Sequence, residues 1–251
     1  MALAIAGTPT KGYATAASSV TFAHTATGDG LFVGSGGYGD PARTTSSVTF
    51  NGDSLTELWD INDTYWGNFS NAGYLMCAPD TGSSYNVVVT MSGTMDMLMA
   101  GAVGISGLAS PVGSAHGTIY TDQDSASVTV VDSEADNLVI DTFVTYQPSV
   151  TVGASQTSQN EYDSPEDSGH SFGISTEPAS GANTVMSWNT ADAPKCIGAT
   201  ALIAAAGGGE TYNVTDWAGF RVGDSPALYM PTLTATQDGA TIDLTWTMPD
   251  D

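Results

Sequence analysis

The chain is dominated by short segments in which apolar and polar residues alternate. The phrase Ser18-Ser19-Val20-Thr21-Phe22 recurs as Ser46-Ser47-Val48-Thr49-Phe50. Successive side chains of a strand point to opposite faces, so Val and Phe share one face while Ser and Thr share the other. This pattern is typical of antiparallel sheets with one buried face and one face in water.

Segments rich in Val, Ile, Thr, Phe and Tyr recur between clusters of Gly, Asp, Asn and Ser, which predicts many short strands. The predicted strands are residues 19–25, 30–35, 47–50, 54–59, 73–78, 85–91, 97–105, 127–131, 138–146, 171–175, 184–188 and 196–205. No long window has helical periodicity. The predicted fold class is therefore all-β: an antiparallel β-sandwich, jelly-roll-like, with a short C-terminal β extension.

We place a domain boundary at Gly223-Asp224-Ser225-Pro226. Residues 1–224 form the predicted sandwich domain, and residues 225–251 form the extension. The extension ends in Leu244-Thr245-Trp246-Thr247-Met248-Pro249 and resembles the first two strands of a fibronectin type III domain. The resemblance covers only this extension, so we expect a lone hairpin that packs on the main domain or on a neighbouring subunit.

The charge balance is strongly acidic, with 27 Asp and Glu against 4 Lys and Arg, and a formal net charge of -23. The basic residues are Lys11, Arg43, Lys195 and Arg221. Binding to nucleic acids and to anionic membranes depends on such residues, so neither is an expected partner. Mutual repulsion opposes the compact state unless salt screens it, which predicts a salt-adapted protein.

Features of export and membrane insertion are missing from the sequence pattern. No segment approaches the roughly 20 apolar residues that span a bilayer. Residues 1–6 lack the basic region of a signal peptide and form too short an apolar run. We therefore expect a mature chain or a protein that leaves its cell without a signal, for example in a virus particle released by lysis.

The glycine run Gly34-Ser35-Gly36-Gly37-Tyr38-Gly39 matches the G-x-G-x-x-G pattern of dinucleotide-binding proteins. That site requires a helix to begin at the glycines, so that its N-terminus meets the pyrophosphate. Here residues 40–45 lead directly into another predicted strand. The run is interpreted as a flexible loop, and no nucleotide is expected.

Catalytic chemistry is not indicated. His24, His116 and His170 lack metal-ligand spacing, and no G-x-S-x-G elbow supplies a nucleophile. Glu57 and Asp60 could serve as a glycosidase pair only if their environments moved their pKa values apart, and nothing in the sequence does so. We predict no enzyme and no catalytic residue.

Metal and disulfide sites are weakly indicated at most. The acidic runs 122–124, 132–136 and 161–167 do not match EF-hand spacing, so solvated loops are expected, with a weak calcium site as the alternative and no other cofactor. Cys77 and Cys196 each lie in an apolar predicted strand. Two buried thiols are expected, with one disulfide between them as the alternative, while metal ligation is disfavoured.

The stretch from Trp59 to Phe69 is the best candidate binding surface, because aromatic faces beside Asn and Asp suit sugar rings. The candidate glycan or partner residues are Trp59, Asn62, Asp63, Tyr65 and Trp66. The alternative is that Trp59 and Phe69 cap the core beneath a long loop.

Five phrases of the main domain carry a further resemblance, at residues 47–56, 73–82, 86–90, 186–188 and 196–202. By these phrases the domain resembles β-sandwich modules in structural proteins of tailed phages and related viruses. This resemblance implies a virion structural protein on the particle exterior, as a capsid decoration or a head or tail fibre component. The expected partners are capsid or tail proteins of the same virion and further copies of the chain.

Two other functions remain open from the sequence. A carbohydrate-binding module would attach to a host or to a polysaccharide. A β-sandwich hydrolase or lyase would need a pair of catalytic carboxylates that the sequence does not show.

Overall fold

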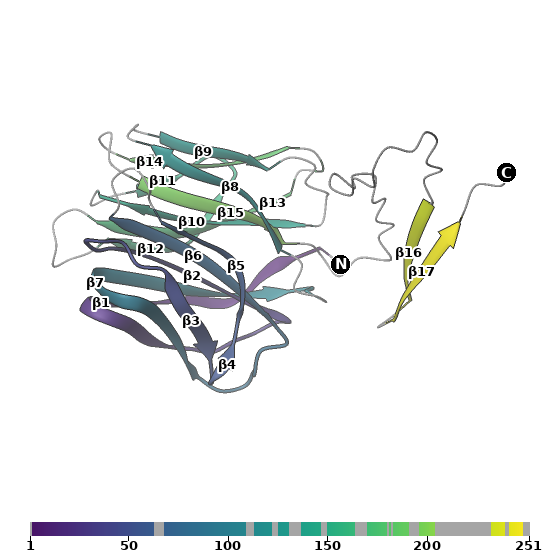
Figure 1. Cartoon of the computed structure of the whole chain (residues 1–251), viewed down its shortest axis with the longest axis horizontal. Helices are drawn as coiled ribbons and strands as arrows, with labels where there is room; N and C mark the ends of the chain where they lie inside the picture. The colour runs from purple at the N-terminus through teal and green to yellow at the C-terminus, as the bar shows by residue number, and fades with distance from the viewer. Residues whose placement is uncertain are drawn as a thin grey trace, which may run out of the picture. The chain divides into compact units, whose positions relative to one another are not determined.

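The computed structural model of the chain describes residues 2–62, 68–108, 113–121, 125–130, 137–146, 150–163, 170–179, 181, 183–190, 196–203, 232–238 and 241–247. The chain divides into two compact units, Met1–Ala206 and Gly207–Asp251. The described residues form strands, turns and bends and contain no helix (Figure 1). The prediction of an all-β, antiparallel sandwich is thus confirmed. No helix in this part of the chain could cross a membrane.

Sheet A is the largest sheet and has seven strands in the order β4-β3-β7-β2-β6-β5, with β1 on the other side of β7. Its strands are β1 (Ala4–His24), β2 (Gly30–Tyr38), β3 (Thr45–Phe50), β4 (Asp53–Ser54), β5 (Thr56–Asn62), β6 (Phe69–Cys77) and β7 (Tyr85–Ser106). The recurring Ser-Val-Thr-Phe phrase forms the end of β1 and the body of β3. Both copies bury Val and Phe as predicted.

Strands β1 and β7 bend, so that sheet A curls into a nearly closed barrel. The first part of β7 pairs with β3 and with residues 19–24 of β1, whereas its second part pairs with β2 and with the N-terminal part of β1. The two parts of β1 then face each other: the Thr10 hydroxyl and His24 Nδ1 lie 2.8 Å apart. The barrel interior is apolar and includes Val20, Leu31, Val48, Phe50, Val87 and Leu98.

Sheet B packs against the outside of this barrel. Its order is β12-β13-β10-β15-β8, with β8 (Gly113–Thr121), β10 (Leu138–Thr145), β12 (Thr157–Asp163), β13 (Ser171–Pro178) and β15 (Cys196–Ile203). The predicted strand at 196–205 is confirmed for residues 196–203, which form β15. The core between the sheets includes Phe32, Leu75, Val103, Ile140, Phe172 and Ile174.

The glycine run is part of this interface. The prediction of a flexible loop at residues 34–39 is wrong, because residues 34–38 belong to β2. A methyl group at Gly34 would lie 2.4 Å from Thr142 Cγ2, and one at Gly36 would lie 2.2 Å from Val144 Cγ2. Glycine is required here because the two sheets approach too closely for a side chain.

Sheet C covers the other face of sheet B (Figure 1). It has the order β11-β14-β9, formed by β9 (Ser125–Val130), β11 (Val150–Val152) and β14 (Thr184–Thr190). Phe143 of β10 stacks on Trp188 of β14 with ring centroids 5.5 Å apart. The first unit is thus a stack of sheets in which sheet B is covered on both faces.

The second unit contains an antiparallel hairpin of β16 (Thr232–Asp238) and β17 (Thr241–Thr247). The sequence predicted such a hairpin in the extension, and its strands are confirmed. The predicted domain boundary at residue 224 lies outside the described residues, and so do Lys195 and Arg221.

Candidate functional site

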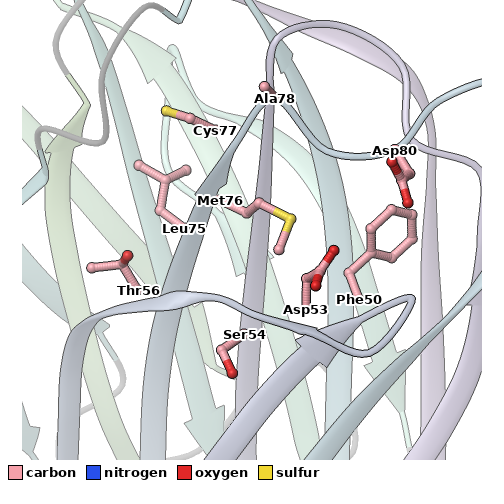
Figure 2. Close-up of a pocket in the computed structure, with 9 residues that line it drawn as sticks. All are labelled: Phe50, Asp53, Ser54, Thr56, Leu75, Met76, Cys77, Ala78 and Asp80. Carbon is pink, nitrogen blue, oxygen red and sulfur yellow. The ribbon is translucent and has the colours of Figure 1, made fainter.

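A pocket of about 320 Å³ opens at the corner between β4 and β5 (Figure 2). The last pair that joins β5 to β6 is Thr56 with Leu75, while β4 pairs with β3 instead. The chain turns between them at Leu55, whose amide donates to Val48 O at 3.0 Å. The end of β6 is therefore left without a neighbour from β5, and the pocket occupies this gap.

The turn between β3 and β4, next to the pocket, is a tight hairpin turn. Asn51 and Gly52 both have positive φ, 51° and 91°, and they connect Phe50 with Asp53, its partner in the strand ladder. Asn-Gly is the preferred pair for a two-residue turn of this kind. The Asn51 side chain also donates to Asp80 Oδ2 at 2.7 Å, so the hairpin is tied to the segment after β6. These contacts preform the pocket.

The pocket lining is mainly polar. Asp53 and Asp80 contribute carboxylates, and Ser54 and Thr56 contribute hydroxyl groups. Figure 2 shows Met76 extending toward Asp53 and Phe50, with Leu75 and Cys77 on the other side of β6. The remaining lining residue is Ala78. Among the described residues that line the pocket there is no Lys, Arg or His, so its chemistry favours hydroxyl-bearing or positively charged ligands.

The two carboxylates considered from the sequence, Glu57 and Asp60, lie on one face of β5. Residues three apart on a regular strand point to opposite faces. Here the register shifts between Glu57 and Trp59, and this bulge turns Asp60 to the side of Glu57. Tyr74 of β6 lies beside them, and its hydroxyl donates to Glu57 Oε2 at 3.2 Å.

Burial raises the pKa of Asp60 from 3.8 to about 6; the hydrogen bond from the Thr45 amide opposes this shift, and the nearby charge of Glu57 adds to it. The same burial, with the charges of Glu57 and Asp60, raises the pKa of Tyr74. The Thr45 amide of β3 donates to Asp60 Oδ2 at 2.8 Å. Asp60 therefore joins β3 to β5 across the seam at which the barrel is not closed by strand pairing.

The structure corrects the predicted binding role of Trp59. Its side chain is only 4% exposed, packs on Phe32 with centroids 5.8 Å apart, and donates from Nε1 to Asn71 Oδ1 at 2.8 Å. Its ring lies over Gly73, where a methyl group would approach it to 2.4 Å. The alternative, that Trp59 and Phe69 belong to the core, is confirmed. An indole held in this way cannot stack on a sugar.

The described part of the structure does not show the other predicted surface residues forming one surface. Asn62 ends β5 and is half-buried. Asp63, Tyr65 and Trp66 lie outside the described residues. The prediction of a glycan surface at these positions therefore remains a prediction.

An aromatic cluster that the sequence analysis did not identify lies at the start of β6. His170 is buried between Tyr38 and Tyr146, with ring centroids at 4.9 and 4.5 Å, and Phe69 lies at 6.3 Å. Tyr146 is 50% exposed. The residues of this aromatic cluster come from β2, β6 and the ends of β10 and β13, so the cluster forms only when the sheets pack together.

The thiol and metal predictions have mixed outcomes. Cys77 is a free thiol and half-buried, and burial raises its pKa. The side chain of Cys196 lies outside the described residues. Within the described residues, no group of three or more His, Cys, Asp and Glu side chains could hold a metal ion. The acidic runs 122–124 and 132–136, and residues 164–167 of the third run, are not described.

Comparisons with known proteins identify no relative: no family model, no curated protein and no solved structure matches the chain. Function must therefore be argued from the geometry and charge of this chain.

Proposed function

We propose that the chain is a structural module on the exterior of a virus particle, which self-associates and docks on capsid or tail proteins without catalysis. It would be exposed to the medium once the particle is released. Two features support the proposal. One is that its few described cations are used within the fold. The other is an edge segment of β1, residues 19–24, whose exposed side chains are small and uncharged.

The main support for an outward position on the particle comes from the contacts that the Lys11 and Arg43 side chains make within the fold. Lys11 Nζ donates to the backbone carbonyl of Glu161 and so ties β1 to β12. The half-buried Arg43 side chain packs on Gly93, where a methyl group would lie 2.9 Å from Nε. No other Lys or Arg occurs among the described residues. A surface that offers so little positive charge is unsuited to packaged nucleic acid and suited to the outside of a particle.

The edge of sheet A supports self-association. Among the described strands, β1 pairs only with β7. The exposed side chains of residues 19–24 are Ser19, Thr21 and Ala23, which are small and uncharged. Natural edge strands are usually protected by charged residues, proline or bulges. Residues 19–24 contain no charged residue and no proline, and the nearest bulge lies before them, between Ala17 and Ser19. Such an edge can accept another strand.

The experiment compares oligomeric state by analytical ultracentrifugation for the full chain and two variants. Thr21→Glu places a like charge on each copy at the edge and should shift the assembly toward monomer. Thr94→Glu makes the same change at an exposed position in the bend of β7 and should leave the assembly intact. A monomeric full chain, or equal effects of both variants, would contradict the edge association. Cryo-EM of native particles tests the exterior location.

Carbohydrate binding is the second candidate function, and the half-exposed Tyr146 favours it. The ring of Tyr146 packs in a T-shaped arrangement against His170, which in turn packs against Tyr38, and its exposed part offers a face for stacking on a sugar. A glycan array on the full chain, Tyr146→Ala and Trp66→Ala tests this function. Binding that is lost in either variant would support attachment to a glycan, and no binding to any glycan would reject it.

A further inference from the structure

The corner pocket between β4 and β5 has the dimensions of a binding site. Its volume of about 320 Å³ is at the lower end of the range for small-molecule sites. The Asn51–Asp80 hydrogen bond and the Asn-Gly turn hold its walls in place. A preformed pocket loses little conformational entropy on binding, which favours affinity for a small ligand.

The charge of the lining selects the ligand class. Asp53 and Asp80 would repel an anion, and no Lys, Arg or His stands among the described lining residues to offset them. A purely apolar ligand would bury these carboxylates and the hydroxyl groups of Ser54 and Thr56 without partners, which is unfavourable. A ligand with several hydroxyl groups satisfies both conditions, because each hydroxyl can donate to a carboxylate and also accept a hydrogen bond.

We propose that this pocket binds a single neutral sugar ring or a polyol of similar size. The carboxylates of Asp53 and Asp80 accept hydrogen bonds from ligand hydroxyls on the side of the hairpin. The hydroxyl groups of Ser54 and Thr56 pair with further ligand oxygens. Met76 supplies an apolar contact for the carbon skeleton, since its thioether extends toward Asp53 (Figure 2). The site is distinct from the aromatic cluster, because β6 begins at Phe69 beside that cluster and ends at Cys77 beside the pocket.

Cys77 provides a local readout, because the residue lines the pocket and its thiol, which lies on the other side of β6 from Met76 (Figure 2), is free. The experiment measures the rate at which iodoacetamide alkylates Cys77 in the full chain, followed by peptide mass spectrometry. The probes are glucose, galactose, mannose, N-acetylglucosamine and glycerol, with glucuronic acid as the anionic counterpart. We expect at least one neutral probe to slow alkylation of Cys77 in a saturable manner, in EDTA as well as in calcium, while glucuronic acid has no effect.

Variants establish the contacts. Asp53→Ala and Asp80→Ala should weaken protection at least about tenfold, the usual scale for losing a charge-assisted hydrogen bond. Asp96→Ala removes an exposed carboxylate from β7 and serves as the matched control without effect. Ser54→Ala and Thr56→Ala test the hydroxyls if an aspartate variant fails to fold. Absent protection, equal protection by glucuronic acid, dependence on calcium, or protection unchanged in all four lining variants would each overturn the proposal. None of these outcomes affects the proposed exterior role.

Discussion

The indole Nε1 of Trp188 donates to Asp141 Oδ2 at 2.8 Å, which joins sheet C to sheet B through a fully buried carboxyl group. The other oxygen, Oδ1, accepts hydrogen bonds from the Ser175 hydroxyl at 2.6 Å and from the Ser175 amide at 3.1 Å. Burial raises the pKa of Asp141 from 3.8 to about 7, against the opposing effect of these hydrogen bonds. The group therefore binds its proton more tightly in the folded protein than in the unfolded chain.

The first prediction concerns pH. Between pH 4 and pH 7 the unfolded chain loses the Asp141 proton while the folded protein retains it, so this group's contribution to stability falls as pH rises. Asp141→Asn cannot titrate and should show a shallower decline in the free energy of unfolding over this range. Urea unfolding at several pH values measures the difference, with Asp96→Asn as the exposed control. If the free energy of unfolding fell equally with pH in the full chain and in Asp141→Asn, the raised pKa of Asp141 would be contradicted.

The same variant should also lower stability at neutral pH. One side of Asp141 faces two donors of Ser175, and the other faces the Trp188 indole. An asparagine must turn its NH₂ toward one of these donors, which leaves a buried donor without an acceptor at a cost of about 1–3 kcal/mol. Trp188→Phe removes the opposing donor, so the double variant should lose less than the sum of the single changes. Strict additivity in urea unfolding would argue against the contact.

A third prediction concerns the glycine-lined interface between sheets A and B. Gly36→Ala would place a methyl group 2.2 Å from Val144 Cγ2 and should cost about 1–3 kcal/mol through overpacking. Val144→Ala in the same chain should recover part of this loss, because it makes room for the methyl group. Gly39→Ala is the control, since its nearest neighbour is the flexible Met95 thioether at 3.1 Å. Failure of Val144→Ala to relieve the loss would show that another neighbour of the methyl group, such as Phe172 Cδ2 at 3.0 Å, causes it.

A substitution at Trp59 can distinguish a structural role of this side chain from a role in binding. Trp59→Phe keeps most of the buried ring but removes the hydrogen bond to Asn71 Oδ1, which still accepts one from the Thr142 hydroxyl at 2.6 Å. We expect a loss of about 1 kcal/mol in the free energy of unfolding and unchanged glycan-array signals. If Trp59→Phe left the stability unchanged but lost a glycan signal, Trp59 would belong to the binding surface after all.

Salt should stabilise the folded protein. The excess of acidic residues gives a formal net charge of -23, and screening reduces their repulsion. The melting temperature at pH 7 should rise from low to molar NaCl. The rise should shrink at pH 3.5, where many carboxylates are protonated. A flat response at pH 7 would contradict salt adaptation.

Much of the fold follows from local patterns in the sequence. Alternation of Val and Phe with Ser and Thr located the end of β1 and most of β3, a β-branched run located β10, and an apolar, Ala-rich run located β15. The first part of β1 was missed because residues 7–17 are mostly small and polar, with no alternation. β12 was missed because Thr157-Ser158-Gln159-Asn160-Glu161 has no apolar face. Both strands are held by pairing with distant residues, which no local pattern encodes.

The candidate sites were less accessible to sequence reasoning. A bulge at β5 decides that Trp59 is buried and that Glu57 and Asp60 share a face, and the strand pattern does not reveal it. The pocket exists because β4 and β5 diverge at Leu55, beside the end of β6. The glycine run at 34–39 could have been recognised as strand from its position after Leu31-Phe32-Val33. Its motif similarity and high glycine content suggested a loop instead.

The length of β1 and β7 has a mechanical consequence. The two strands run antiparallel and remain paired through both layers of the barrel, from Ala4 with Ser106 to His24 with Tyr85. A pulling force along the strand axis would load many of their hydrogen bonds at once, in shear, whereas a force across the axis would open them one after another. The barrel should therefore resist stretching along these strands far better than peeling of β1 from its edge.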